Sequence, residues 1–408
     1  MSGADCLGRV NVGRAWSGTS HRPGRRRLVA PGACAACLLA VCAIVAVPRV
    51  AIAQDAATGD LGTLPAVEIH GPRNAALVYW RLWQKVPEDL KIGLTQSFNG
   101  RDLDWAPDAS LAEQLDTNRA LADALRVASQ MPVCDFGVDQ TAGLGADMSH
   151  LERLRESSRI LVSSARLCLN RGDMDTFVAS TRSLLTMSHH TTADGFTQSC
   201  TVGLGFAVMG ADEILRAIRH VRLTEAHVKA FDEDLRRAME NDAYGFVNAI
   251  RVEGRVLSKH LVDRYAGPTD ENGRTAGARL FMDIQQGGEP EGLYKAITEM
   301  DGPGLTAAAE RIVAAFDAVA LAWRSESPLE SVRAVEERVA KGEFGPLGLM
   351  VVPRYSSIRE FVDSCRVKIG EAVEAMKHPP AELVAIPVPK VEPMGPALGP
   401  SGDGVKGE

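Results

Sequence analysis

The side chains best suited to acid–base chemistry gather in one glycine-rich loop, residues 133–148, and in the histidine that follows it. Asp135, Asp139 and Asp147 supply three carboxylates, and His150 lies three residues further on. General acid–base catalysis needs a pair of such groups, one of them with a pKa raised by apolar surroundings. These four residues are therefore the candidates for a hydrolase site. Loop acids also commonly cap helices or hold turns, and we favour that structural role and predict no catalytic residue.

Three histidines suggest a second chemistry, the binding of a metal ion. His189 and His190 end one expected helix and His150 begins the helix beside it, so an antiparallel arrangement would bring them close. Adjacent histidines on a helix point about 100° apart and rarely share one ion. Histidine at a helix C-terminus is also favoured by the helix dipole. We therefore expect no metal site, and these three residues are the candidates if one exists.

The remaining sequence contains no string typical of a cofactor or catalytic site. It has no H-E-x-x-H, G-x-S-x-G, phosphate-binding P-loop or EF-hand pattern, so we predict no cofactor. The short G-x-G at residues 203–205 lies within a helical pattern rather than after a strand. Gly203, Ala207 and Ala211 recur every four residues, which predicts close packing against a neighbouring helix.

The first 53 residues have the composition of an export signal. Arginines at 25–27 precede an apolar stretch over residues 33–47, and the small-x-small segment 51–53 lies just before Gln54. The apolar stretch is shorter than the roughly 20 residues that span a membrane. We expect cleavage after Ala53, export to the periplasm or the medium, and no membrane span afterwards. The arginine cluster leaves two routes open, the general secretory route and the twin-arginine route.

The charge of the exported part argues against two kinds of partner. Residues 1–53 hold seven arginines and one acidic residue, so their removal changes the formal charge from −7 to −13. Nucleic-acid affinity depends on clustered Lys and Arg, and attraction to an anionic membrane surface requires the same residues. We therefore expect neither as a partner.

Apolar residues recur with helical spacing through most of the remaining chain. This predicts an all-α fold, an antiparallel multi-helix bundle of helical hairpins over residues 71–377, with an irregular insertion at 266–304. Residues 54–70 are expected to be a flexible lead-in, and the Pro/Gly-rich residues 378–408 a disordered tail. Long helices are expected at 73–85, 108–130, 147–170, 174–190, 196–221, 224–239, 242–265, 305–323, 328–341 and 354–377, with short ones at 275–286 and 291–300 inside the insertion.

Four cysteines remain after removal of the signal, and in an oxidising compartment they allow three complete pairings. If the helices at 147–170 and 174–190 run up and down, Cys134 and Cys200 lie at the same end of the bundle. Cys168 then lies at the opposite end, too far away to pair with either. The prediction is a Cys134–Cys200 disulfide, if any forms, and a buried free thiol at Cys168.

The middle of the chain resembles a known group of proteins. The segments QMPVCDFGVD and HLERLRESSRILVSSARLCLNRGDMDTFVASTRSLLTMSHH, within residues 108–222, resemble a large set of secreted, all-helical proteins of planctomycete-type bacteria. Phe136 stands where we expect Trp more often in that set. The resemblance implies a helical fold and export, and it implies no activity, cofactor or catalytic residue.

Two functional hypotheses follow. The first is an exported helical scaffold or binding protein, which acts through a surface or groove on a protein of the cell envelope or the extracellular space. The alternative is a cell-envelope hydrolase that uses the acidic residues of the 133–150 loop. A structure discriminates between them, because a hydrolase needs at least two of the four candidate side chains to meet in a pocket.

Overall fold

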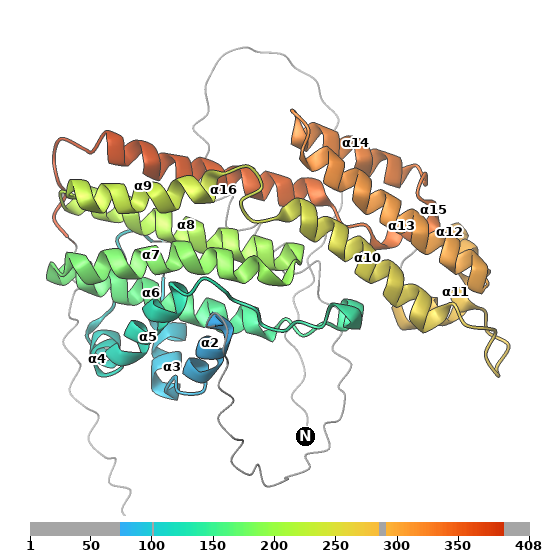
Figure 1. Ribbon diagram of the computed structural model, residues 1–408, viewed down its shortest axis with the longest axis horizontal. Helices are drawn as coiled ribbons and strands as arrows, with labels where there is room; N and C mark the ends of the chain where they lie inside the picture. Colours follow the sequence, from blue (N-terminus) through green and yellow to red (C-terminus); the bar gives the residue numbers. More distant parts are fainter. Residues whose placement is uncertain (1–73, 100–101, 285–290, 387–408) are drawn as a thin grey trace, which may run out of the picture. The chain divides into compact units, whose positions relative to one another are not determined.

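The computed structural model describes residues 74–99, 102–284 and 291–386, all within one compact unit of the chain. These residues form helices joined by turns, with no strand among them and one isolated β-bridge between Asn74 and Val133. The predicted all-α fold is therefore confirmed (Figure 1). The expected signal, the lead-in and residues 387–408 of the expected tail lie outside the described residues.

The first helices along the chain are α2 (Ala75–Trp83), α3 (Glu88–Ser97), α4 (Ala109–Thr117), α5 (Arg119–Ser129), η1 (Gln140–Gly145), α6 (Ser149–Arg171), α7 (Met174–His190), η2 (Thr191–Asp194) and α8 (Thr197–His220). The later ones are α9 (Glu225–Met239), α10 (Phe246–Tyr265), α11 (Ala276–Ile284), α12 (Glu291–Thr298), α13 (Gly302–Trp323), α14 (Pro328–Ala340), α15 (Gly345–Val351) and α16 (Tyr355–Lys377). Within the described ranges, no helix combines the length and the apolar character needed to cross a membrane.

Most helix ends lie within a few residues of the predicted ones, because local capping signals set them. Asp173 caps α7 by accepting a bond from Thr176 N at 3.2 Å, and Thr224 caps α9 by accepting one from His227 N at 3.2 Å. Between α6 and α7, Gly172 adopts the left-handed conformation (φ 76°) that commonly ends a helix.

The predicted single helix over residues 108–130 is wrong. The structure has two helices there, α4 and α5, which meet at Asn118. The Asn118 side chain donates to Gln114 O at 2.8 Å and so competes for the backbone bonds that would continue the helix. The short helices α3 and α15 were not among the predicted elements.

Helices α6, α7 and α8 lie side by side and alternate in direction, as the expected turn at Gly172 requires (Figure 1). The N-terminal ends of α6 and α8 meet, since His150 of α6 donates from Nε2 to Oδ2 of Asp194, just before α8, at 3.0 Å. Helix α8 contacts α6, α7, α9, α10 and α16. Seventeen of its 24 residues are buried, so the other helices pack around it.

Helix α16 departs from the hairpin pattern, because it runs parallel to α8. At the N-terminal ends of both helices, Glu253 of α10 accepts bonds from Thr197 N and from Tyr355 OH, each at 2.8 Å. Further along, Lys368 Nζ donates to Asp212 Oδ1 at 3.3 Å. The hairpins from α6 to α9 are thus antiparallel as expected, and α16 adds a parallel neighbour.

Two apolar clusters form the core of the described residues. The smaller one joins α2–α5 to the first half of α6 and includes Tyr79, while the larger one extends from the second half of α6 to α16 and includes Phe231. Helix α8 contributes to both, with Phe206 in the smaller cluster and Ala207 in the larger one. Burial of apolar surface, at roughly 25 cal/mol per Å², is the main stabilising contribution of such clusters.

The predicted irregular insertion contains a helical hairpin. Helices α11 and α12 fall where two short helices were predicted, and the rings of Phe281 and Tyr294 meet edge to face with centroids 4.5 Å apart. Helix α13 then begins at Gly302, where Asp301 accepts a bond from Gly304 N at 2.8 Å.

Helices α7 and α8 approach closely at Gly203, which the sequence pattern indicated, and at Gly210, which it did not. A Cβ atom at Gly203 would lie 2.3 Å from Ser188 O, and one at Gly210 would lie 2.7 Å from Leu185 Cδ2. Neither position has room for a side chain. Gly205, on the same helix, has no atom within 4 Å of the place where a Cβ would be.

We predict that Gly203→Ala lowers the free energy of unfolding by about 1–3 kcal/mol, because the added methyl group forces the two backbones apart. The matched control is Gly205→Ala, which is expected to be neutral or stabilising by up to about 1 kcal/mol, since alanine is the better helix former. Urea unfolding followed by circular dichroism measures both. Equal stability of the two variants would mean that the close contact between α7 and α8 is absent.

Candidate functional site

The acidic residues of the 133–148 loop are exposed. Asp135 and Asp147 each accept a bond on Oδ1 from the backbone N–H two residues further on, at 2.8 and 2.9 Å. Asp139 precedes η1, and its carbonyl accepts a bond from Ala142 N at 3.2 Å. None of the three lines either of the two hollows described below. The bonds that the Asp135 and Asp147 carboxylates accept are those of turn and cap residues.

His150, the fourth candidate, is buried beneath Phe136, with the two ring centroids 4.5 Å apart. Its Nε2 donates to Asp194 Oδ2 at 3.0 Å, and Ser199 Oγ donates to the same oxygen at 2.6 Å. These three residue types make up a catalytic triad, but the connectivity differs, because here the serine bonds to the carboxylate rather than to the imidazole. The sequence analysis missed Asp194, since no local pattern marks it as the partner of His150.

The two other histidines of the candidate metal set also have partners within the protein. His190 accepts a bond from Tyr79 OH on Nδ1 at 3.2 Å and donates from Nε2 to Met131 O at 2.9 Å. His189 stacks on Tyr244, with ring centroids 5.2 Å apart and ring planes within 3° of parallel. Among the described residues, no group of three or more His, Cys, Asp or Glu side chains is placed to hold a metal ion.

The predicted disulfide between Cys134 and Cys200 is not formed. Both are buried free thiols, and Cys168 is a third free thiol, as expected, although only partly buried. Cys134 packs in the smaller apolar cluster and Cys200 in the larger one, so the two side chains face different cores. Burial raises the pKa of the Cys134 thiol to about 12, which keeps it protonated and unreactive.

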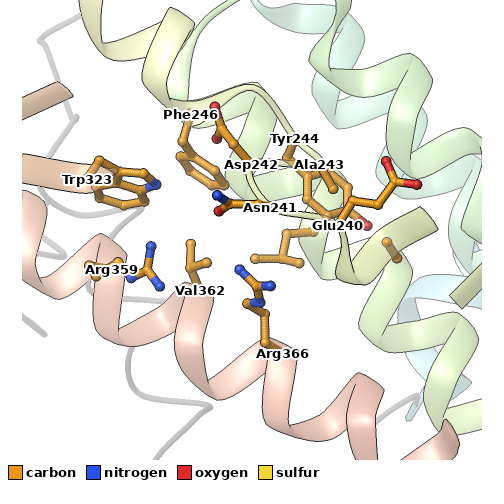
Figure 2. Close-up of a pocket in the computed structure, with 12 residues that line it drawn as sticks. Glu240, Asn241, Asp242, Ala243, Tyr244, Phe246, Trp323, Arg359, Val362 and Arg366 are labelled. Atoms are coloured by element: carbon orange, nitrogen blue, oxygen red, sulfur yellow. The ribbon is translucent and has the colours of Figure 1, made fainter. Parts of the chain in front are cut away.

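One hollow lies between the α9–α10 turn and α16 (Figure 2). Figure 2 shows Arg359 and Arg366 reaching from α16 toward Asp242 and its neighbours in the turn. Arg359 lies over the Trp323 ring at 5.3 Å, and Arg366 donates to Met239 O at 2.8 Å, so both guanidinium groups have partners. The inner volume of about 20 Å³ suits one or two water molecules. Pockets for organic ligands are usually roughly 300 Å³ or larger.

A group of charged side chains is buried between α6 and α8. Arg166 donates from Nε to Glu213 Oε1 at 2.8 Å, and both residues are almost completely buried. Arg166 and Arg216 also donate to backbone carbonyls of residues 102–105. These bonds attach the segment before α4 to the bundle. Neither hollow touches this group, so its contacts are those of a structural connection.

The turn between α8 and α9 holds a non-helical segment that is distant in sequence, residues 378–386. Arg222 donates from Nη1 to Pro380 O and from Nη2 to Ala381 O, both at 2.6 Å. A guanidinium group suits this pair of bonds, because its donors are fixed in a planar fork. The first nine residues of the expected disordered tail are therefore docked on the helical domain.

A second contact with this segment lies at the C-terminal end of α8. Val384 N donates to Arg219 O, one of the last carbonyls of the helix, at 2.8 Å. His220, which is buried, donates from Nδ1 to Val384 O at 2.8 Å. All four bonds reach the backbone of the segment, and the side chains of residues 379–385 are exposed. These four bonds therefore do not depend on the identity of the segment's side chains.

An apolar hollow adjoins the docked segment. It has an inner volume of about 50 Å³. The residues that line it come from α8, from α9 and the turn before it, from α16 and from the segment itself: Ile218, Val221, Arg222, Leu223, Val228, Met376 and Pro379.

Comparison of the chain with protein-family models, curated proteins and solved structures finds no match. The resemblance to secreted planctomycete-type proteins stays a prediction, and the function is inferred from the geometry of the described residues. The sequence analysis missed Arg222 and His220 as site residues. Their partners lie about 160 positions away, and no pattern in the sequence links the two regions.

We predict that His189 makes the protein less stable in acid. Burial lowers the pKa of His189 from 6.5 to about 4, so the unfolded chain binds the proton more tightly than the folded one. The contribution of His189 to the free energy of unfolding is then fully present above pH 6.5. It falls as the pH drops toward 4, by up to about 3 kcal/mol. His189→Phe keeps a ring against Tyr244 and removes this loss. Urea unfolding at pH 7.5 and 4.5 measures the difference, and an equal acid loss in both proteins would contradict it.

Proposed function

We propose that the protein is an exported helical binding protein that holds a short polypeptide segment at the α8–α9 turn. The observation that supports this proposal is the set of hydrogen bonds that hold residues 378–386. The Arg222 and His220 side chains donate to backbone carbonyls of the segment, and Arg219 O accepts a bond from its backbone. Main-chain hydrogen bonds are the usual source of affinity when a protein binds a peptide in a groove or along an edge. Because the four bonds reach only the backbone, a segment of another protein has the same groups to offer.

The contacts of three acid–base candidates, Asp135, Asp147 and His150, support binding over hydrolysis. A hydrolase needs two of them in one pocket, at a distance that allows proton transfer to a substrate. Asp135 and Asp147 instead accept bonds from their own turns, and His150 donates to the buried Asp194. We therefore prefer the binding hypothesis.

The proposed location is the periplasm or the medium. The arginine cluster, the apolar stretch and the small-x-small site within residues 1–53 support export, and so does the resemblance to secreted planctomycete-type proteins. A partner met there is a protein of the cell envelope or the extracellular space. The formal charge of −13 after cleavage argues against nucleic acid and anionic membrane surfaces as partners.

The proposal is tested by measuring the binding of a separate, labelled synthetic peptide of residues 378–386, blocked at both ends. In the full chain, Val384→Pro removes the N–H that bonds to Arg219 O and so loosens the chain's own segment. Fluorescence anisotropy is expected to show saturable binding of the peptide to this variant. Adding Arg222→Ala should weaken binding about tenfold or more, because two hydrogen bonds from a charged group are lost.

The matched control is Arg219→Ala in the same Val384→Pro background. The Arg219 side chain is exposed and has the same charge, and its backbone carbonyl stays in place to accept a bond. Removal of the Arg219 side chain is expected to change the affinity for the peptide less than about twofold. Circular dichroism confirms that each variant is folded. Absence of saturable binding, or an equal loss for both arginines, contradicts the proposal.

Export predicts a defined N-terminus. The mature chain is expected to begin at or near Gln54, because the signal peptidase cleaves after a small-x-small segment. N-terminal sequencing of the protein recovered from the periplasm or the medium of an expressing bacterium measures this. A chain that keeps residues 1–53 and stays in the cytoplasm would contradict the proposed location.

A further inference from the structure

The hollow beside the docked segment is not filled by Pro379, the residue of the segment that lines it. Pro379 is the only part of the segment among the lining residues, yet about 50 Å³ stays open. One water-sized group needs roughly 10–15 Å³, so the hollow has room for several methyl-sized groups. A proline ring is compact and is bonded back to its own backbone, so it does not extend into this space.

The chemistry of the lining determines what fits there. Ile218 and Met376 are buried, Val221, Leu223 and Val228 are half-buried, and all five are apolar. The sixth lining side chain, Arg222, directs its guanidinium donors to two backbone carbonyls of the segment. Water finds few hydrogen-bond partners among these walls, whereas an aliphatic side chain that enters removes apolar surface from water.

We infer that this hollow is the specificity pocket of the docking site. Its preferred ligand is a polypeptide segment with a larger aliphatic side chain, leucine or methionine, at the position that Pro379 occupies. The inference rests on the proposed function of the α8–α9 turn, and it adds which partner segments that turn selects.

The chain's own segment is a weak occupant by this criterion. The side chains of residues 379–385 are exposed, so the segment buries little apolar surface and depends on four hydrogen bonds to its backbone. Such bonds add only modest net affinity, because water replaces them when the segment leaves. A partner segment that makes the same bonds and also fills the hollow displaces it.

The test compares two labelled nine-residue peptides on the full Val384→Pro chain. One has the sequence of residues 378–386, and the other has the substitution Pro379→Leu. Each methylene group that becomes buried strengthens binding about fourfold, so the leucine peptide is expected to bind about tenfold tighter. In the wild-type chain, the unlabelled leucine peptide is expected to speed hydrogen exchange at the Val384 amide, because that amide loses its bond to Arg219 O.

Filling the hollow from the protein side provides the control. Val228→Leu and Val228→Phe, each in the Val384→Pro chain, are expected to abolish the preference for the leucine peptide, because the larger side chain occupies the hollow. Ala226→Phe adds the same ring at an exposed position near the start of α9 and should keep the preference. Circular dichroism and thermal melts verify that each variant folds.

Each outcome has a separate meaning. Equal affinities of the two peptides for the Val384→Pro chain overturn the specificity pocket and leave the proposed function standing. A leucine preference that survives both Val228 variants also overturns it, since the pocket then lies elsewhere. Failure of both peptides to bind overturns the proposed function itself.

Discussion

Burial of α8 is the constraint on which the rest of the described structure depends. This helix contacts five others, and Gly203 lets α7 approach to the distance of a backbone contact. A buried polar group without a partner costs about 1–3 kcal/mol, so partners supplied by neighbouring elements make the burial of α8 less costly. Glu213 illustrates this: burial raises its pKa and the adjacent Arg166 lowers it, so the ion pair from α6 offsets part of the cost of burying the carboxylate.

The same demand accounts for the bonds made by the residues suited to catalysis near the start of α8. At the N-terminal end of α8, Asp194 accepts bonds from His150 and Ser199, and these bonds connect α6 to α8. Glu253, from α10, accepts bonds from Thr197 and from Tyr355 of α16, and burial raises its pKa. Acids, a histidine and hydroxyl groups are thus gathered in one place, but they serve to join four helices, and neither hollow opens onto them.

The features that the sequence predicted are those determined by neighbours in sequence. Helix α7 has the predicted bounds because Gly172 and Asp173 mark its start, and the close contact of α7 with α8 follows from the spacing of small residues such as Gly203. The features that it missed depend on tertiary contacts. Cys134 and Cys200 were placed by helix length alone, which fixes the end of the bundle but not the face, and the role of Arg222 depends on a segment about 160 residues away.

The candidate site follows from the way in which α8 ends. The last carbonyls of any helix have no partner within it, and at the end of a buried helix water reaches them poorly. Arg219 O is such a group, and here the N–H of Val384 satisfies it while His220 and Arg222 bind neighbouring carbonyls of the same segment. The helix end needs a backbone donor and not a particular side chain, so the proposed binding of other segments does not depend on the side chains at these contacts. Selectivity must then come from whatever lies beside the backbone contacts, and the feature there is the apolar hollow between Ile218 and Met376.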